Sequence, residues 1–175
     1  TLSSSSAASD VYKRQEPIAL GEFLDDVAAR FRAQADDAKI GLSVDYPEGL
    51  PLVQLDAALM ERALSNLLDN ALRFTPASGQ VRVNVIRNDQ NVRIEVVDTG
   101  PGVSAEDQPR VFDRFFQGSR HREQRGSSGL GLAIVRRIAE LHGGKAGLTS
   151  VPSAGARFWI ELPLIAAASA PFRQA

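Results

Sequence analysis

The 175-residue sequence contains no cysteine, and its 20 basic and 21 acidic residues leave a net charge of −1. The absence of cysteine excludes a disulfide framework and a thiolate metal site. The near-neutral charge gives no bulk attraction to nucleic acid or to an anionic membrane, so we expect neither as a partner of this chain. Its apolar runs are far shorter than the roughly 20 residues that span a bilayer, and its start lacks the charged and apolar regions of a signal peptide.

The two ends of the sequence differ in composition from its middle. Residues 5–15 read S-S-A-A-S-D-V-Y-K-R-Q, which resembles the translation of a transposase sequencing adapter, so we expect residues 1–15 to be non-native and disordered. A native serine-rich linker is the alternative. The alanine-rich residues 165–175 are expected to form a flexible tail, which leaves residues 16–164 as one domain.

Hydrophobic periodicity predicts an alternation of helices and short strands within that domain. Asp56 is the expected N-cap of a central helix that stops near Thr75-Pro76. The other predicted elements are a helix over 20–38, a strand over 40–46, a hairpin of strands 81–85 and 92–96 with its turn at 88–91, a helix over 130–141 that ends at Gly143-Gly144, and strands over 148–151 and 158–162.

Two asparagines, Asn66 and Asn70, lie in the otherwise helix-forming run of residues 56–76. Asparagine is a poor helix former, and a spacing of four residues places both side chains on one helix face, with Arg62 and Arg73 near it. Amide oxygens can ligate a hard cation, and arginine can pair with phosphate. This face is therefore a candidate site for a metal-bound phosphate. The alternative is a solvated helix face with two tolerated asparagines.

Glycine patches follow this helix along the chain. In the first, Asp98 ends a strand beside Gly100 and Gly102. A carboxylate there can accept a hydrogen bond from an exocyclic amine such as that of adenine, and glycines let a ring approach; a simple Asp-Thr-Gly turn is the alternative. In the second, Gly129 and Gly131 open a helix whose free N–H groups can bind phosphate. This pattern fits neither a P-loop nor a dinucleotide-binding fingerprint.

Five motifs follow one another in the order N-L-L-D-N-A-L-R-F-T, D-T-G-P-G, F-D-R-F-F, G-L-G-L-A-I-V-R-R-I and H-G-G. Together they closely resemble the ATP-binding catalytic domain of bacterial sensor histidine kinases, over about Glu16 to Leu164. That domain shares a superfamily with DNA gyrase, the heat-shock chaperone and MutL. The resemblance implies a Bergerat-type α/β two-layer sandwich, in which a mixed sheet of about five strands packs on three helices, with ATP and Mg²⁺ as cofactors.

The resemblance also implies a role for each motif residue. Asn70 would ligate the Mg²⁺ that bridges the phosphates, and Asn66 would support it. Arg73 would contact phosphate, Phe74 would line the nucleotide site, and Asp98 would bond the adenine amine. Six residues of the glycine motifs would border the adenine, the phosphates or the start of the following helix: Gly100, Gly102, Gly129, Leu130, Gly131 and Leu132.

Residues 101–128 form the expected lid over the phosphates. Four residues match the F box that anchors it: Phe112, Arg114, Phe115 and Phe116. We expect the three aromatic side chains to pin the middle of the lid against the body, so that mobility concentrates in residues 117–128. Three lid arginines are candidates for reaching the γ-phosphate, with Arg125 taken forward although the sequence does not choose among them: Arg120, Arg122 and Arg125.

Two positions depart from the family pattern. Ser127 stands where the second glycine motif often has an extra glycine, and Ser153 stands before Gly155 where glycine is frequent. Neither departure removes a group that the chemistry needs, although a different hinge for the lid would follow.

The residue types favour phosphoryl transfer over hydrolysis. Related ATPases carry a glutamate one helical turn before the metal-ligating asparagine, where this chain has Asn66, and an amide cannot act as a general base. The two histidines, His121 and His142, lack the H-E-x-x-x-P surroundings of a phosphoacceptor. We expect His142 to bond the carbonyl groups at its helix end instead.

We therefore predict that the chain binds Mg·ATP and donates the γ-phosphate to a histidine on a separate dimerisation domain of a two-component sensor kinase. The receiver domain of a response regulator is the other expected partner. The expected location is the cytoplasm, with an inner-membrane sensor as one form of the parent protein. Two alternatives stay open: a degenerate module that only senses ATP or ADP, and a serine kinase of the anti-sigma type.

Overall fold

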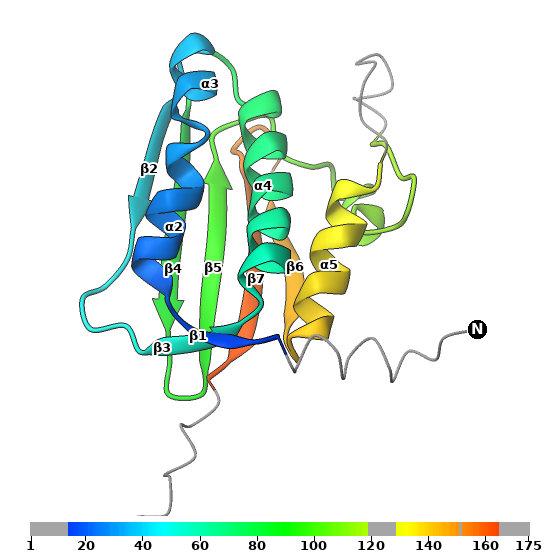
Figure 1. The fold of residues 1–175 in the computed structure, drawn as a ribbon. Coiled ribbons are helices and arrows are strands. Elements are labelled where there is room, and N and C mark those ends of the chain that lie inside the picture. Colours follow the sequence, from blue (N-terminus) through cyan, green and yellow to red (C-terminus); the bar gives the residue numbers. More distant parts are fainter. Residues whose placement is uncertain (1–13, 119–128, 151, 165–175) are drawn as a thin grey trace, which may run out of the picture.

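The computed structural model describes residues 14–118, 129–150 and 152–164. They form two layers, a five-stranded sheet and a layer of helices on one face of it (Figure 1). The strand order is β2-β4-β5-β7-β6; β2 and β4 are parallel and the other neighbours are antiparallel. The predicted mixed sheet is therefore confirmed. The strands are β2 (Gly41–Asp45), β4 (Gln80–Arg87), β5 (Asn91–Asp98), β6 (Lys145–Ser150) and β7 (Ala156–Pro163).

The helix layer contains four α-helices in the described ranges, one more than predicted. They are α2 (Leu20–Ala29), α3 (Arg32–Asp37), α4 (Ala57–Phe74) and α5 (Gly131–Leu141). The prediction of one helix over 20–38 is wrong, because the chain turns between α2 and α3. There the Phe31 N–H donates to Ala28 O at 2.9 Å, three residues back. The turn changes the direction of the chain before α3, and the Phe31 side chain stays buried in the core.

A second, two-stranded sheet was not predicted. Strand β1 (Glu16–Ala19) pairs antiparallel with β3 (Leu52–Leu55), below the helix layer in Figure 1. Each strand has four residues, and their partners are distant in sequence, so neither carries a clear periodic signal alone. Val53 and Leu55 face inward and are fully buried. Strand β3 is followed directly by α4, with only Asp56 between them.

The hydrophobic core lies between the helices and the inner face of the sheet. Alternate residues of β4 and β5 point into it, as the predicted period of two requires: Val81, Val83, Val85, Val92, Ile94 and Val96. Helix α4 contributes the apolar residues of one of its sides to the same core: Met60, Ala63, Leu64, Leu67, Leu68 and Ala71. The predicted N-cap is confirmed, because Asp56 Oδ1 accepts a hydrogen bond from Leu59 N at 3.0 Å. Within the described ranges, no helix has both the length and the apolar character to cross a bilayer.

Helix α5 ends where the sequence predicted. The Gly143 N–H donates to Glu140 O and the Gly144 N–H donates to Ala139 O, which satisfies the last carbonyl groups of the helix. Gly143 has a φ of +71°, and a Cβ on Gly144 would collide with the backbone oxygen of Glu161. The H-G-G motif is thus a helix stop followed by close packing on β7.

The last strand pair is longer than predicted. Strand β6 begins at Lys145, three residues before the expected start, and is paired along its length with β7. Lys145 and Arg93 are the cross-strand neighbours of Glu161 on β7. Glu161 accepts a hydrogen bond from Arg93 at 2.6 Å and lies 3.0 Å from Lys145, so ion pairs link the three strands at the added residues. Residue 151, the expected strand end, lies outside the described residues.

Ser153, one of the two positions that depart from the family pattern, has a backbone conformation that favours glycine. Ser153 has a φ of +67°, and its N–H donates to Pro101 O at 2.7 Å. We expect Ser153→Gly to raise the free energy of unfolding by about 0.5–1 kcal/mol, because glycine adopts a positive φ without strain. Thermal unfolding measures this as a rise of about 1–4 °C. The same change in the exposed β2 residue Ser43 should lower stability; an unchanged or lower melting temperature for Ser153→Gly would contradict the strain.

Candidate functional site

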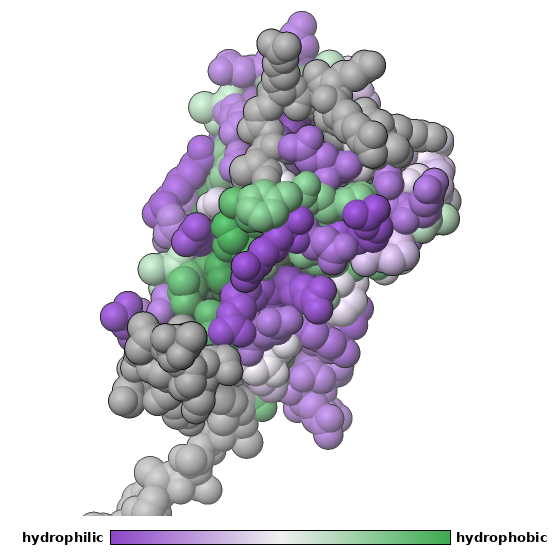
Figure 2. All heavy atoms as spheres, turned by 90° about the vertical axis from the view of Figure 1, so that its right-hand side faces the viewer, coloured by the Kyte–Doolittle hydropathy of each residue, from purple (hydrophilic) through white to green (hydrophobic). Residues whose placement is uncertain are grey.

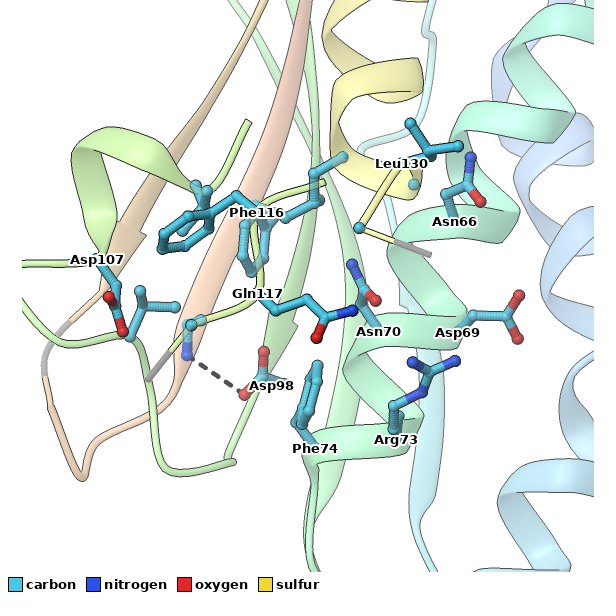
Figure 3. Close-up of a pocket in the computed structure, with 18 of the residues that line it drawn as sticks. Asn66, Asp69, Asn70, Arg73, Phe74, Asp98, Asp107, Phe116, Gln117 and Leu130 are labelled. Carbon is cyan, nitrogen blue, oxygen red and sulfur yellow. Dashed lines mark hydrogen bonds between the residues drawn. The ribbon is translucent and has the colours of Figure 1, made fainter. Parts of the chain in front are cut away.

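A pocket of about 460 Å³ opens between the C-terminal half of α4, the end of β5, the loop after β5 and the start of α5 (Figure 3). This volume lies in the usual range for small-molecule sites. Ten of the twelve residues expected to contact the nucleotide line it: Asn66, Asn70, Arg73, Phe74, Asp98, Gly102, Gly129, Leu130, Gly131 and Leu132. Of the other two, Gly100 does not line the pocket but donates its N–H to Asp98 Oδ1, and Arg125 lies outside the described residues.

The polar wall of the pocket comes from α4. Asn66, Asn70, Arg73 and Phe74 follow one another at spacings of four, three and one residues, which places them on one side of the helix while its apolar stripe faces the core. In Figure 3, Asn70 and Phe74 point toward the centre of the pocket, while Asp69, which also lines it, directs its carboxylate to the other side of α4 from Asn70. Amide and guanidinium groups therefore predominate along this wall, and Asp69 contributes the one carboxylate that α4 brings to the lining.

Asn66 gives the clearest sign that the polar wall meets a ligand. Its Nδ2 atom is buried and has no hydrogen-bond partner among the described residues. A buried, unpaired donor is costly, and a phosphate oxygen or a metal-bound water would satisfy it. Amide oxygens suit Mg²⁺, and the nearby Arg73 suits phosphate. The residues present therefore fit a Mg²⁺-bound polyphosphate.

Asp98 supplies the acceptor at the opposite end. It is 6% exposed, and its Oδ1 accepts hydrogen bonds from Gly100 N at 2.8 Å and Ala156 N at 3.3 Å. The second carboxylate oxygen has no partner among the described residues and points into the pocket in Figure 3. Asp98 is thus fixed by the fold through one oxygen and presents the other to a ligand donor.

Burial raises the pKa of the Asp98 carboxyl above its usual value, and the N–H groups of Gly100 and Ala156 only partly offset this. The folded state therefore holds this proton more tightly than the unfolded state. The resulting contribution to stability is fully present below the unfolded pKa of about 3.9 and is lost as the pH rises through the folded pKa.

The stability of wild type relative to Asp98→Asn is expected to decline as the pH rises through this window. Asparagine does not titrate, so the difference between the two proteins isolates the Asp98 carboxyl. Urea unfolding at pH values from about 3 to 7 measures it. A difference in unfolding free energy that stays constant over this range would contradict the raised pKa.

The remaining wall is mostly apolar, with Ser104, Asp107 and Gln117 as its polar members, and sequence reasoning largely missed it. Six side chains from the loop after β5, α5 and β7 make it up: Val103, Val111, Phe116, Ile134, Ala156 and Phe158. Phe112 lies edge-on to Phe158, with ring centroids 6.3 Å apart. A flat apolar wall beside Asp98 suits a heteroaromatic ring that carries an amine. The only sequence signal was the apolar cluster at 111–116, because the other members come from distant segments.

The F box anchors the loop differently from the prediction. Phe115 is 70% exposed and has a φ of +62°, so the expectation that it pins the lid against the body is wrong. The turn directs its side chain outward, while its N–H donates to Gly129 O at 2.9 Å. Val111 is buried instead, and Phe116 lines the pocket beneath Arg110 at 4.8 Å. Arg114 is exposed.

The two glycines at the start of α5 serve different purposes. Gly129 has a φ of +67°, and a Cβ there would lie 2.8 Å from the backbone of Phe115. Gly131 is the first residue of α5, and a Cβ there would be 3.5 Å from Asn66 Oδ1, an ordinary contact. Gly129 thus joins the loop to the helix, and Gly131 begins the helix next to Asn66.

Several expectations fall on residues outside the described ranges: Arg120, His121, Arg122, Arg125 and Ser127. His142 lies far from the pocket, at the end of α5. Its Nδ1 is 2.8 Å from Ile138 O, so the expected bond to a helix-end carbonyl is confirmed.

Comparison with known proteins gives a consistent family. A sequence model described as histidine kinase-, DNA gyrase B- and HSP90-like ATPase matches residues 55–166. The adaptive-response sensory kinase SasA of Rippkaea orientalis is 36% identical over 140 residues, which cover 79% of this chain and 36% of the relative. The sensor-like histidine kinase SenX3 of Mycobacterium tuberculosis is 38% identical over 141 residues, covering 80% of this chain and 34% of the relative. The chain thus spans about a third of these relatives' length.

Solved structures agree with this. Full-length ShkA in complex with AMPPNP superposes with a TM-score of 0.78 at 33% identity, covering 88% of this chain and 32% of that chain. The mycobacterial sensor histidine kinase MprB gives a TM-score of 0.75 at 32% identity, covering 85% of this chain and 97% of that chain. The chain therefore belongs to the family of histidine kinase-, DNA gyrase B- and HSP90-like ATPases, and within it to the ATP-binding catalytic domains of sensor histidine kinases.

Proposed function

We propose that residues 16–164 bind Mg·ATP and donate its γ-phosphate to a histidine on a separate dimerisation domain. The observation that carries this proposal is the pocket itself. It joins an inward-pointing oxygen of Asp98, an apolar wall, and the amide groups of Asn66 and Asn70 in one cavity. These are the partners that an adenine amine, an adenine ring and a metal-bound triphosphate require.

Each end of the nucleotide has its own partners in this proposal. Asp98 accepts from the adenine amine, and Phe74 borders the ring. Asn70 would ligate Mg²⁺ through its amide oxygen, Asn66 donates its unpaired Nδ2 to a phosphate oxygen or a bound water, and Arg73 adds positive charge. Mg²⁺, when bound, neutralises charge on the phosphates.

The groups beside the phosphates favour transfer over hydrolysis. Asn66 cannot abstract a proton from water. Asp69, the carboxylate on the same helix, lines the pocket but is exposed, and its side chain points away from Asn70 in Figure 3. The described residues therefore offer the phosphates positioning and charge neutralisation without an activated water.

The isolated chain is expected to bind ADP and ATP with Mg²⁺ but to turn ATP over slowly and to leave itself unlabelled. The reasons are Asn66 in place of a base and the position of His142, which is buried at the far end of α5. Incubation of the chain with γ-labelled ATP, followed by gel analysis at acid and alkaline pH, checks this. Self-labelling at a rate that rivals an intact sensor kinase would contradict it.

The exposed surface near the pocket is suited to a partner domain. Figure 2 views the side of the molecule that carries α5 and β6, and it shows an apolar band bordered by hydrophilic residues. Phe115, in the loop that borders the pocket, exposes 70% of its surface. We propose that the dimerisation domain, which carries the acceptor histidine, contacts this side, and that a response regulator receives the phosphate afterwards. The domain would act in the cytoplasm, where ATP is available.

A further inference from the structure

His142 connects two helices at the end of the molecule opposite the pocket. It is 6% exposed. Its Nε2 lies 2.9 Å from the backbone N of Asp56, the N-cap of α4, and its Nδ1 lies 2.8 Å from Ile138 O, one turn earlier in α5. Because a backbone N–H can only donate, Nε2 must accept, and the proton must be on Nδ1. The neutral imidazole thus bridges the C-terminus of α5 and the N-terminus of α4.

This bridge is not needed to end α5. Gly143 and Gly144 already cap the last carbonyl groups through their own N–H groups. The bond from Asp56 N is additional, since it joins residues 86 positions apart in the sequence. It also satisfies a backbone donor that would otherwise be buried beside the helix start.

The same two helices build the phosphate end of the pocket. Figure 1 shows α4 and α5 side by side and running in opposite directions. At the pocket, the first residue of α5, Gly131, faces Asn66 of α4, with 3.5 Å between a Cβ placed on Gly131 and Asn66 Oδ1. Along either helix, this contact is about 15 Å from the His142–Asp56 bond, at a rise of 1.5 Å per residue.

The packing between these two contacts is apolar. Met60, Leu64 and Leu67 of α4 and Val135 and Ile138 of α5 are buried in the common core. Such contacts hold two helices together but are non-directional, so they tolerate a small axial shift better than a hydrogen bond does. A hydrogen bond depends on both distance and angle and constrains sliding strongly.

We propose that His142 is a positioning residue for the nucleotide site: its bond to Asp56 N sets the axial register of α5 against α4, and so fixes Gly131 relative to Asn66. The proposal rests on the nucleotide-binding function proposed above. A small axial shift of α5 would move the N–H groups at its start away from phosphates held by Asn66 and Asn70, without opening the core.

Two variants separate the bond between helices from the bond within α5. In His142→Asn, the side-chain NH₂ can replace Nδ1 as donor to Ile138 O, but nothing reaches Asp56 N. In His142→Gln, the amide oxygen lies close to the position of Nε2 and can accept from Asp56 N. Both remove the ring, so they serve as each other's control for lost packing.

The test measures Mg·ADP affinity by calorimetry and records amide NMR spectra without nucleotide. We expect His142→Asn to bind Mg·ADP about fivefold more weakly than His142→Gln, and to shift the signals of the Gly131 N–H and the Asn66 side-chain amide. His142→Gln should keep both near wild type. Equal affinities and equal Gly131 and Asn66 signals in the two variants would overturn the proposal.

The two readouts distinguish this proposal from the proposed function. A wild-type chain that binds no Mg·ADP would contradict the proposed function, and the NMR comparison would then decide the role of His142 alone. A purely structural role predicts that both variants lose stability and affinity together. Rescue by glutamine but not by asparagine is the result that only the register role explains.

Discussion

Replacing Asp98 with asparagine is expected to weaken ADP and ATP binding by about tenfold to a hundredfold while the fold is kept, a loss of about 1–3 kcal/mol. The amide oxygen of asparagine can still accept from the N–H groups of Gly100 and Ala156, which hold Asp98 Oδ1 in the folded protein. The amide nitrogen would then occupy the position that points into the pocket. Two donors would face each other where the adenine amine now meets an acceptor.

Calorimetric titration of both proteins with Mg·ADP measures this effect. Asp89→Asn is a matched control, because Asp89 lies at the exposed turn between β4 and β5, away from the pocket. It should bind as wild type does. Equal ADP affinity in wild type and Asp98→Asn, with both proteins folded, would mean that the adenine amine does not contact Asp98.

Asn70→Ala is expected to remove the Mg²⁺ dependence of ATP binding and to lower phosphoryl transfer by at least about a hundredfold. The change deletes the amide oxygen that we propose as the protein's ligand to the metal, on the side of α4 that lines the pocket. Adenosine, which carries no phosphate, should bind the variant and wild type equally.

The measurement compares ATP affinity with Mg²⁺ and with a chelator in the two proteins. Asn84→Ala is the matched control, because Asn84 is an asparagine on β4 that does not line the pocket. The prediction fails if Mg²⁺ strengthens ATP binding to Asn70→Ala as much as it does to wild type.

The polar half of the site was predictable because each part depends on local geometry. The spacing of Asn66, Asn70 and Arg73 determines a helix face whatever surrounds it, and the alternation of β5 puts Asp98 at its inner end. The capping role of Asp56 also depends only on its neighbours. These residues therefore lie in the structure where periodicity placed them.

The parts that were missed depend on contacts between distant segments. The pairing of β1 with β3 and the bond between His142 and Asp56 join residues far apart in sequence, and no local pattern marks either one. The outward Phe115 has an apolar side chain in an apolar cluster, so composition favoured burial; its positive φ, set by the turn against Gly129, decided otherwise. The break in the helix at Arg30 is likewise a result of keeping Phe31 in the core.

Phosphoryl transfer to a separate polypeptide tests the central claim most directly. The chain is mixed with γ-labelled ATP, Mg²⁺ and the dimerisation domain of a related sensor kinase, supplied as its own protein. Our account predicts an acid-labile, alkali-stable label on the histidine of that domain, absent when that histidine is replaced and strongly reduced with Asp98→Asn. A chain that binds ATP yet leaves the histidine unlabelled would contradict transfer and indicate a nucleotide-sensing module, and an acid-stable label on serine would contradict the histidine as acceptor.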